Sequence, residues 1–181
     1  MQRDYLKILV SGPYASGKTT FVKTISSGKV LTTEVPVSTL YESQIKQYTT
    51  VAFDYCRVNL DGTDVYVFGT PGQTRLQFMW RVLAVGMHGY IFIVDGSSML
   101  NVMRSRTVYE YMKNLGDYPH VIAVNKQDLP NSIKPSTVAQ VFGVNNDIVV
   151  PLVALKKESA ISVLQRAVEL IRAQKPKYRA E

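Results

Sequence analysis

The sequence predicts an α/β fold, a three-layer sandwich in which helices cover both faces of a mainly parallel six-stranded sheet with one antiparallel edge strand. Apolar runs of strand length alternate along the chain with longer stretches whose apolar residues recur every three or four positions. The chain has 181 residues, 46% of them apolar, which is enough for one domain with a sizeable core and too few for a second. We therefore expect residues 1–181 to form a single domain.

The expected elements are, in order, a strand at 5–11, a helix from Lys18, strands at 53–59 and 64–68, a helix at 76–85, a strand at 89–95, a helix at 98–115, a strand from 121, a helix at 135–142, a strand at 148–153 and a helix at 157–174. The dipeptide Asp61-Gly62 between two apolar runs predicts a hairpin, the one antiparallel pair. The run at 89–95 is apolar throughout, as in parallel strands buried on both faces. The segment 28–47 has no clean period, and such stretches in compact domains are normally functional.

A phosphate-binding loop is predicted at 12–19, directly after the first strand. The segment has the sequence G-P-Y-A-S-G-K-T, which matches the pattern G-x-x-x-x-G-K-[ST] of P-loop NTPases. Glycines let the backbone N–H groups surround the α- and β-phosphates, Lys18 reaches the β- and γ-phosphate oxygens, and the Thr19 hydroxyl binds Mg²⁺. The positive end of the helix that begins near Lys18 faces the same anion. Nucleotide contacts are expected from Tyr14, Ala15, Ser16, Gly17, Lys18, Thr19 and Thr20.

The strand that begins at 121 runs into N-K-Q-D, a pattern typical of guanine-binding loops. The Asp128 carboxylate can accept two hydrogen bonds from the guanine N1–H and exocyclic amine, a donor pair that adenine lacks, so discrimination is expected to be steep. Asn125 is expected to brace the phosphate loop and the base, and the aliphatic stem of Lys126 to lie along the base. These residues predict GTP and GDP as ligands and disfavour an ATP-dependent kinase of the same loop class.

With both loops present, the chain resembles the small GTPases of the Ras superfamily over nearly its whole length. The segment 69–73, G-T-P-G-Q, lies where that superfamily has D-x-x-G, often followed by glutamine. The resemblance implies that Gly72 donates its backbone N–H to the γ-phosphate and that Gln73 orients the attacking water. Gln73 and Lys18 are therefore the expected catalytic residues.

The same resemblance implies two switch segments and further contacts with the ligand. Switch I is expected at 33–50 and switch II at 69–80. Thr50, in T-V-A-F-D, is similar to the switch I threonine that closes over Mg²⁺ and the γ-phosphate, so Thr19 and Thr50 are the implied metal ligands. Ala154 and Leu155 lie where the superfamily has its S-A-K loop, which implies a contact from the Ala154 N–H to the guanine oxygen.

Two departures from the superfamily pattern bear on metal binding and on rate. Gly69 replaces the aspartate that usually holds Mg²⁺ through a water, so we expect the metal to be held less firmly or by another carboxylate. Asp54 is a candidate, although we favour a solvent-facing strand position for it. Tyr14 occupies a loop position where fast-hydrolysing relatives keep glycine, and a side chain there crowds the space that Gln73 or a partner's arginine must enter. Unassisted hydrolysis is therefore expected to be slow.

The expected function is a GTP-dependent switch that hydrolyses GTP to GDP and phosphate and presents its switch segments to effectors and regulators. G-T-P-G-Q resembles a prokaryotic branch close to the MglA polarity proteins and related to Arf and Rag types, which makes a roadblock-type activating protein a partner by analogy. The alternative is a scaffold or assembly subunit that holds GTP without hydrolysing it, because Gly69 and Tyr14 are both irregular.

Composition gives weaker expectations about partners and location. The net charge is +7, but the basic residues are scattered, and no nucleic-acid motif is found. The basic tail at 172–179 allows weak contact with an anionic membrane, although we favour a solvated terminus. Cys56, the one cysteine, cannot form an internal disulfide, and no signal peptide or lipidation motif is present. We therefore expect a cytoplasmic protein.

Several other side chains carry alternative interpretations. His88 and His120 lack further metal-ligating neighbours in the sequence, so we expect structural roles for both. Phe78, Met79 and Trp80 lie just after Gln73, where members of the superfamily present aromatic groups to partners. An aromatic residue there is either an exposed anchor for a partner or a core residue. Arg75 and Arg81 could act as catalytic arginines within the chain, although solvated surface positions are the interpretation we favour.

Overall fold

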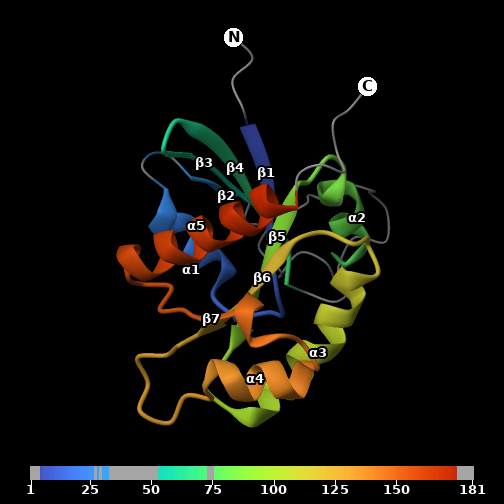
Figure 1. Cartoon of the computed structure of the whole chain (residues 1–181), viewed down its shortest axis with the longest axis vertical. Coiled ribbons are helices and arrows are strands. Elements are labelled where there is room, and N and C mark those ends of the chain that lie inside the picture. The colour runs from blue at the N-terminus through green and yellow to red at the C-terminus, as the bar shows by residue number, and fades with distance from the viewer. Residues whose placement is uncertain (1–4, 27, 29, 33–52, 73–75, 175–181) are drawn as a thin grey trace, which may run out of the picture.

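The computed structural model describes residues 5–26, 28, 30–32, 53–72 and 76–174, and these form a mixed β-sheet between two layers of helices (Figure 1). In the described residues the strands lie in the order β2-β3-β4-β1-β5-β6-β7. They are β1 (Tyr5–Ser11), β2 (Leu31–Thr32), β3 (Asp54–Leu60), β4 (Thr63–Gly69), β5 (Gly89–Asp95), β6 (His120–Asn125) and β7 (Val149–Pro151). Strands β4, β1, β5, β6 and β7 are parallel, and β3 is antiparallel to β4.

The predicted α/β fold is confirmed, with one addition. Strand β2 has only two residues and pairs antiparallel with β3, so β3 is second from the edge rather than at the edge. A strand of two residues has no alternating pattern for a sequence to reveal. The hairpin between β3 and β4 is the expected two-residue turn, because Asp61 and Gly62 both have positive φ, 48° and 82°, as that turn requires.

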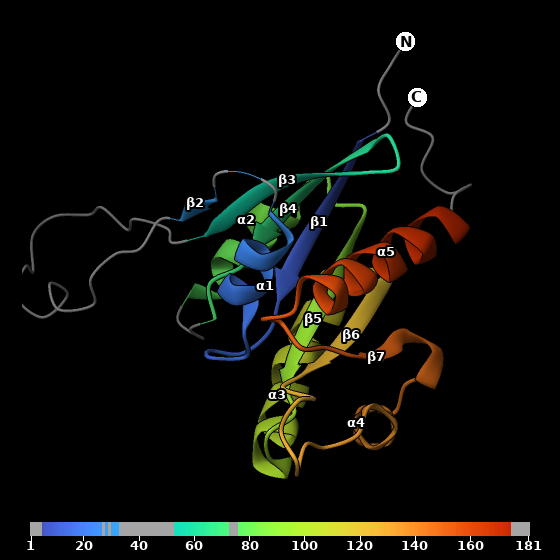
Figure 2. The same cartoon turned by 90° about the vertical axis from the view of Figure 1, so that its left-hand side faces the viewer.

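Helices cover both faces of the sheet (Figure 2). They are α1 (Lys18–Ile25), α2 (Phe78–Ala84), α3 (Met99–Lys113), α4 (Pro135–Phe142), the 3₁₀ helix η3 (Asn146–Ile148) and α5 (Lys157–Ala173). Helices α1 and α5 pack on one face through one apolar cluster, and α2, α3 and α4 pack on the other through a second cluster. The described residues include no helix that is long and apolar enough to cross a membrane.

Local sequence accounts for where these helices begin and which side they bury. Helix α3 begins after Ser98, whose Oγ accepts a hydrogen bond of 3.2 Å from the Asn101 N–H. Helix α4 has Pro135 in its first turn, where no intrahelical donor is needed. Helix α5 buries Leu164, Val168 and neighbours at helical spacing, as predicted. Because the strands are parallel, their carboxyl ends lie at one edge of the sheet, and the loops that follow them meet there.

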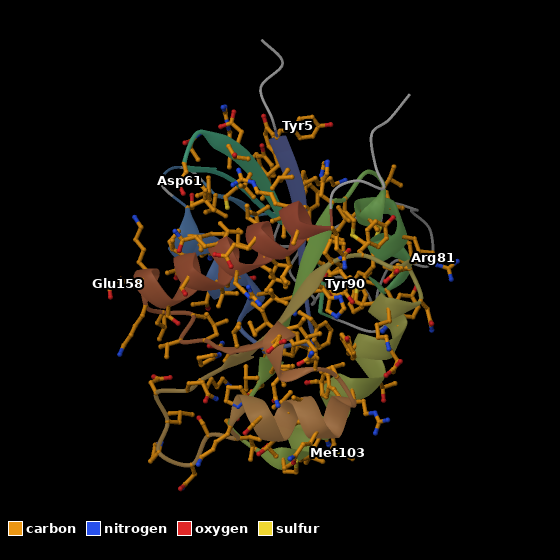
Figure 3. All side chains as sticks on the ribbon, viewed as in Figure 1. Tyr5, Asp61, Arg81, Tyr90, Met103 and Glu158 are labelled. Carbon is orange, nitrogen blue, oxygen red and sulfur yellow. The ribbon has the colours of Figure 1, made fainter. Side chains whose placement is uncertain are left out.

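Both histidines have structural roles, as the sequence indicated. The Lys7 N–H donates to His88 Nδ1 over 2.9 Å. His120 Nε2 lies 2.7 Å from the Tyr109 hydroxyl, and its ring stacks on Tyr90, an interior residue of β5 (Figure 3). The first contact joins β1 to the residue before β5, and the contacts of His120 join β6 to Tyr109 and Tyr90, which belong to the second apolar cluster.

Trp80 belongs to the core and Met79 is partly buried against it, whereas Phe78 is exposed, so the alternative that the sequence left open has a different outcome for each residue. The Trp80 side chain is fully buried on α2, and its Nε1–H donates to the Pro71 carbonyl over 2.9 Å. Phe78, on the same helix, is 52% exposed, and Arg81 is exposed and points away from the body of the molecule (Figure 3). The tryptophan therefore fixes the chain just before Gly72.

Replacement of Trp80 with alanine is expected to lower the free energy of unfolding by about 3–5 kcal/mol, because a large buried side chain leaves a cavity. Urea unfolding followed by circular dichroism measures the loss. The control is Phe78→Ala on the exposed side of α2, for which the loss is expected to stay below about 1 kcal/mol. Equal losses for the two variants would contradict the assignment of Trp80 to the core.

Candidate nucleotide site

The predicted phosphate loop connects β1 to α1 and passes very close to neighbouring strands. Gly12 and Gly17 have φ values of 146° and 106°, which side chains rarely allow. A Cβ added at Gly12 would lie 2.3 Å from the Ile93 carbonyl oxygen, and one added at Gly17 would lie 2.3 Å from Asn125 Nδ2. The glycines are therefore required for the loop to approach β5 and β6 this closely.

Lys18 is buried in the loop, and its ammonium group lies among loop carbonyls. Its Nζ donates to the Gly12 oxygen over 2.8 Å and to the Pro13 oxygen over 2.6 Å. Burial lowers the pKa of Lys18 to about 8, and the negative charge of Asp54 opposes this shift. A positive group is thus held at the mouth of the loop, where the sequence predicted it.

The segment after β4 meets the same loop. A Cβ added at Gly72 would lie 2.6 Å from Lys18 Nζ and 2.9 Å from the Tyr14 backbone nitrogen. Gly72 and the phosphate loop are therefore neighbours, although they are far apart in the sequence. Tyr14 itself directs its side chain outward, with 75% of its surface exposed.

Asp54 is not on a solvent-facing position, and that expectation was wrong. The residue is only 7% exposed, and its Oδ2 accepts a hydrogen bond of 2.6 Å from Thr19 Oγ1. Alternate residues of β3 share one face, and Asp54 is in phase with the buried Cys56 and Val58, which belong to the cluster beneath α1 and α5. The same burial raises the pKa of the Cys56 thiol to about 12.

The predicted guanine loop follows β6, and Asn125 connects it to two other segments. Asn125 Nδ2 donates to the Ser16 carbonyl oxygen, and its Oδ1 accepts from the Ala154 N–H, each over 2.9 Å. The predicted brace between Asn125 and the phosphate loop is therefore present. The structure gives the Ala154 N–H this protein acceptor, and its contact with the guanine oxygen stays a prediction.

Lys126 and Asp128 lie on the outer part of this loop. Lys126 has a positive φ of 66°, and its Nζ forms an ion pair of 2.6 Å with Asp95 Oδ2 at the end of β5. Although burial opposes the charged form, hydrogen bonds from Lys126 and Ser97 hold the pKa of Asp95 below its ordinary value. Asp128 is exposed, so its carboxylate is accessible to a ligand.

Sequence reasoning missed two residues that shape this edge of the site. Asp95 orients Lys126, and Ser159 Oγ accepts a hydrogen bond of 2.9 Å from the Val153 N–H in the loop that contains Ala154 and Leu155. A carboxylate at the end of a fully apolar strand was the available signal for Asp95. Nothing in the local pattern marks Ser159, which acts through a tertiary contact.

Some predicted residues lie outside the described part of the chain. These are Thr50, Gln73, Arg75, the whole of switch I at 33–50 and the tail from 175. The described candidates are at the carboxyl-end edge of the sheet, in the loops after β1, β4, β6 and β7, in the first turn of α1 and at the last residue of β6. They are Tyr14, Ala15, Ser16, Gly17, Lys18, Thr19, Thr20, Gly72, Asn125, Lys126, Asp128, Ala154 and Leu155.

These residues fit a nucleotide phosphate with Mg²⁺. Within the described ranges, the Oγ atoms of Ser11 and Ser16 and Oγ1 of Thr70 are buried without a hydrogen-bond partner, and all three are in the segments that form the cradle. No group of three or more metal-ligating side chains occurs in the same ranges. Among the described residues, the Thr19 hydroxyl and the adjacent Asp54 carboxylate are oxygen donors that could hold a cation, and phosphate oxygens of a bound nucleotide would supply others.

The fold and this edge define the class, a P-loop NTPase with a guanine-type loop. The family model for the ADP-ribosylation factor (Arf) family matches residues 1–172, and the chain belongs to that family. It is therefore a small GTPase of the Ras superfamily. Proteins of this family are GTP-binding switches that hydrolyse GTP and use GTP or GDP with Mg²⁺.

Replacement of Asn125 with alanine is expected to speed release of GDP by roughly 10- to 100-fold, because it leaves the Ser16 carbonyl and the Ala154 N–H unpaired where both sides of the site meet. Release of a fluorescent GDP analogue measures the rate. The control is Asn59→Ala, which removes a 3.1 Å hydrogen bond to Asp64 near the distant hairpin and is expected to leave release unchanged. An Asn125→Ala protein with the parent's release rate would show that this bridge does not hold the nucleotide.

Proposed function

We propose that this protein is a GTP-dependent switch whose hydrolysis is slow without an activator and whose nucleotide state is expressed by the segments 33–50 and 69–80. The observation that carries the proposal is how closely Gly72 approaches Lys18 and Tyr14. A Cβ added at Gly72 would lie 2.6 Å from Lys18 Nζ and 2.9 Å from the Tyr14 nitrogen. A glycine so close to the phosphate-binding lysine can meet a terminal phosphate that is present in GTP and absent from GDP. Loss of that phosphate would then release the segment.

The proposed reaction is attack of water on the γ-phosphorus with cleavage of the bond to the β–γ bridging oxygen, giving GDP and phosphate. Lys18 binds the phosphate oxygens and neutralises charge that develops on them, and Gln73 orients the water. Thr19 and Thr50 would hold Mg²⁺, which neutralises the negative charge of the phosphates when bound.

Tyr14 supports the proposal that unassisted hydrolysis is slow. Its backbone nitrogen would lie 2.9 Å from a Cβ added at Gly72, and its side chain is 75% exposed. A side chain of this size at this loop position would crowd the space that Gln73 or an activator's arginine needs. A roadblock-type activator, the MglA-like branch, the cytoplasmic location and weak membrane contact through the tail remain predictions from the sequence.

Asp128→Asn is expected to reverse the preference for guanine over xanthine by about 10²-fold or more, because the amide can no longer accept both guanine donors and can donate to the xanthine 2-oxygen. Calorimetric titration with GDP and with xanthosine diphosphate measures the preference. Asp117→Asn, on an exposed residue before β6, is the matched control and is expected to keep the parent's preference. An Asp128→Asn protein that still prefers guanine would overturn the assignment of this loop.

Gln73→Leu is expected to slow hydrolysis by about 10²-fold or more, which is what one preorganised polar group contributes to such a step. Single-turnover phosphate release from preloaded GTP measures the rate, and the affinity for GTP serves as the control for folding. Hydrolysis at the parent rate would remove Gln73 from the mechanism.

A non-hydrolysing scaffold is the second candidate, and the departures at Gly69 and Tyr14 favour it. Phosphate release that stays negligible with and without an added activating protein would support the scaffold. Chromatography of the nucleotide carried through purification tests both candidates, because a guanine nucleotide is expected in either case. Recovery of ATP or ADP instead would revive the kinase alternative and contradict both.

A further inference from the structure

We propose that Asp54 of β3 is the positioning carboxylate for Mg²⁺ and takes over the role that related GTPases give to an aspartate at position 69. The inference rests on the proposed function, since it concerns the metal that accompanies the nucleotide. The carboxylate that the superfamily pattern D-x-x-G places at the end of β4 would thus be supplied by the neighbouring strand β3.

Side chains at positions 54 and 69 would occupy the same space. Asp54 and Gly69 are direct partners across the antiparallel β3–β4 pair. A Cβ added at Gly69 would lie 3.1 Å from the Asp54 Cβ and 3.3 Å from Asp54 Oδ2. A side chain at 69 would therefore crowd the carboxylate at 54, and the glycine leaves space for it. Glycine at position 69 in place of aspartate therefore makes room for the aspartate at position 54.

The Asp54 carboxylate is also directed at the metal-binding hydroxyl. Its Oδ2 accepts from Thr19 Oγ1 over 2.6 Å, and Thr19 follows the phosphate-binding Lys18 on the first turn of α1. Position 69 is the last residue of β4, so a carboxylate there would lie at the same end of the sheet as the carboxylate of Asp54. Asp54 thus presents a negative group beside the residue expected to ligate Mg²⁺.

Burial adds a second reason. A charged carboxylate that is only 7% exposed costs free energy unless hydrogen bonds and positive charge compensate. Thr19 supplies a hydroxyl, and Lys18 is close enough to interact through its charge. A divalent cation bound at Thr19 would complete the compensation of the negative charge. A purely structural link between β3 and α1 would not need a charged group at position 54, because an uncharged amide could accept the same hydrogen bond.

The charge-specific variant is Asp54→Asn, which keeps an oxygen that can accept from Thr19. In the full-length protein, the rate of release of a fluorescent GDP analogue is measured as Mg²⁺ is varied. The Mg²⁺ concentration that half-suppresses release is expected to rise by about 10- to 100-fold, as for loss of outer-shell partners of metals. High Mg²⁺ is expected to restore slow release, which a structural defect would not do.

Exchange of the two residues provides the rescue. Asp54→Gly alone is expected to shift the Mg²⁺ midpoint as Asp54→Asn does, and the double variant Asp54→Gly with Gly69→Asp is expected to restore it to within about threefold of the parent. The control is Asp64→Asn, an equally buried carboxylate at the other end of β4 that pairs with Arg57. Its Mg²⁺ midpoint is expected to match the parent. Urea unfolding checks that each variant is folded.

The outcomes separate this inference from the proposed function. An unchanged midpoint in Asp54→Asn, or a shift that neither high Mg²⁺ nor the exchange restores, overturns the role of Asp54 while GDP binding by the parent stands. A parent protein that shows no Mg²⁺-dependent retention of GDP overturns both.

Discussion

Close approach of backbone segments at the carboxyl ends of the parallel strands is the constraint on which the site depends. The loop after β1 lies so near β5, β6 and the segment after β4 that a single carbon added at Gly12, Gly17 or Gly72 would collide with a neighbour at 2.3–2.6 Å. Such approaches need glycine because no other residue lacks the Cβ. The sheet brings the segments together, and the glycines determine how near they come.

The sequence predicted the elements with regular patterns and the loops with fixed motifs. The limits of β5 agree with the expected ones because a continuous apolar run marks this strand. Those of α4 agree because a proline marks its start and a glycine follows its end. Strand β2 was missed because two residues carry no period. The ion pair of Asp95 with Lys126 and the contact of Ser159 with Val153 depend on which strands are neighbours, and local sequence does not contain that information.

Asp54 shows how an error can arise from a correct pattern. Its place in phase with Cys56 and Val58 indicated the buried face of β3, but its charge favoured assignment to solvent. The decisive information was tertiary, because Gly69 across the sheet leaves room for the carboxylate and Thr19 on α1 donates to it. A buried charge without an ion-pair partner among the described residues, such as Asp54, is therefore a candidate for a functional role, whereas the equally buried Asp64 pairs with Arg57.

Trp80 connects the phosphate site to the surface of the molecule. Its indole donates to Pro71, the residue before Gly72, and its ring is fixed in the core. In the proposed switch, Gly72 contacts the γ-phosphate while GTP is bound and is released when that phosphate is lost, and the hydrogen bond from Trp80 to Pro71 would couple α2 to this release. Phe78 and Val82, 52% and 61% exposed, lie on the outer side of the same helix. Nucleotide state would thus change the presentation of an apolar surface, because the helix that carries it is hydrogen-bonded to the segment that contacts the phosphate.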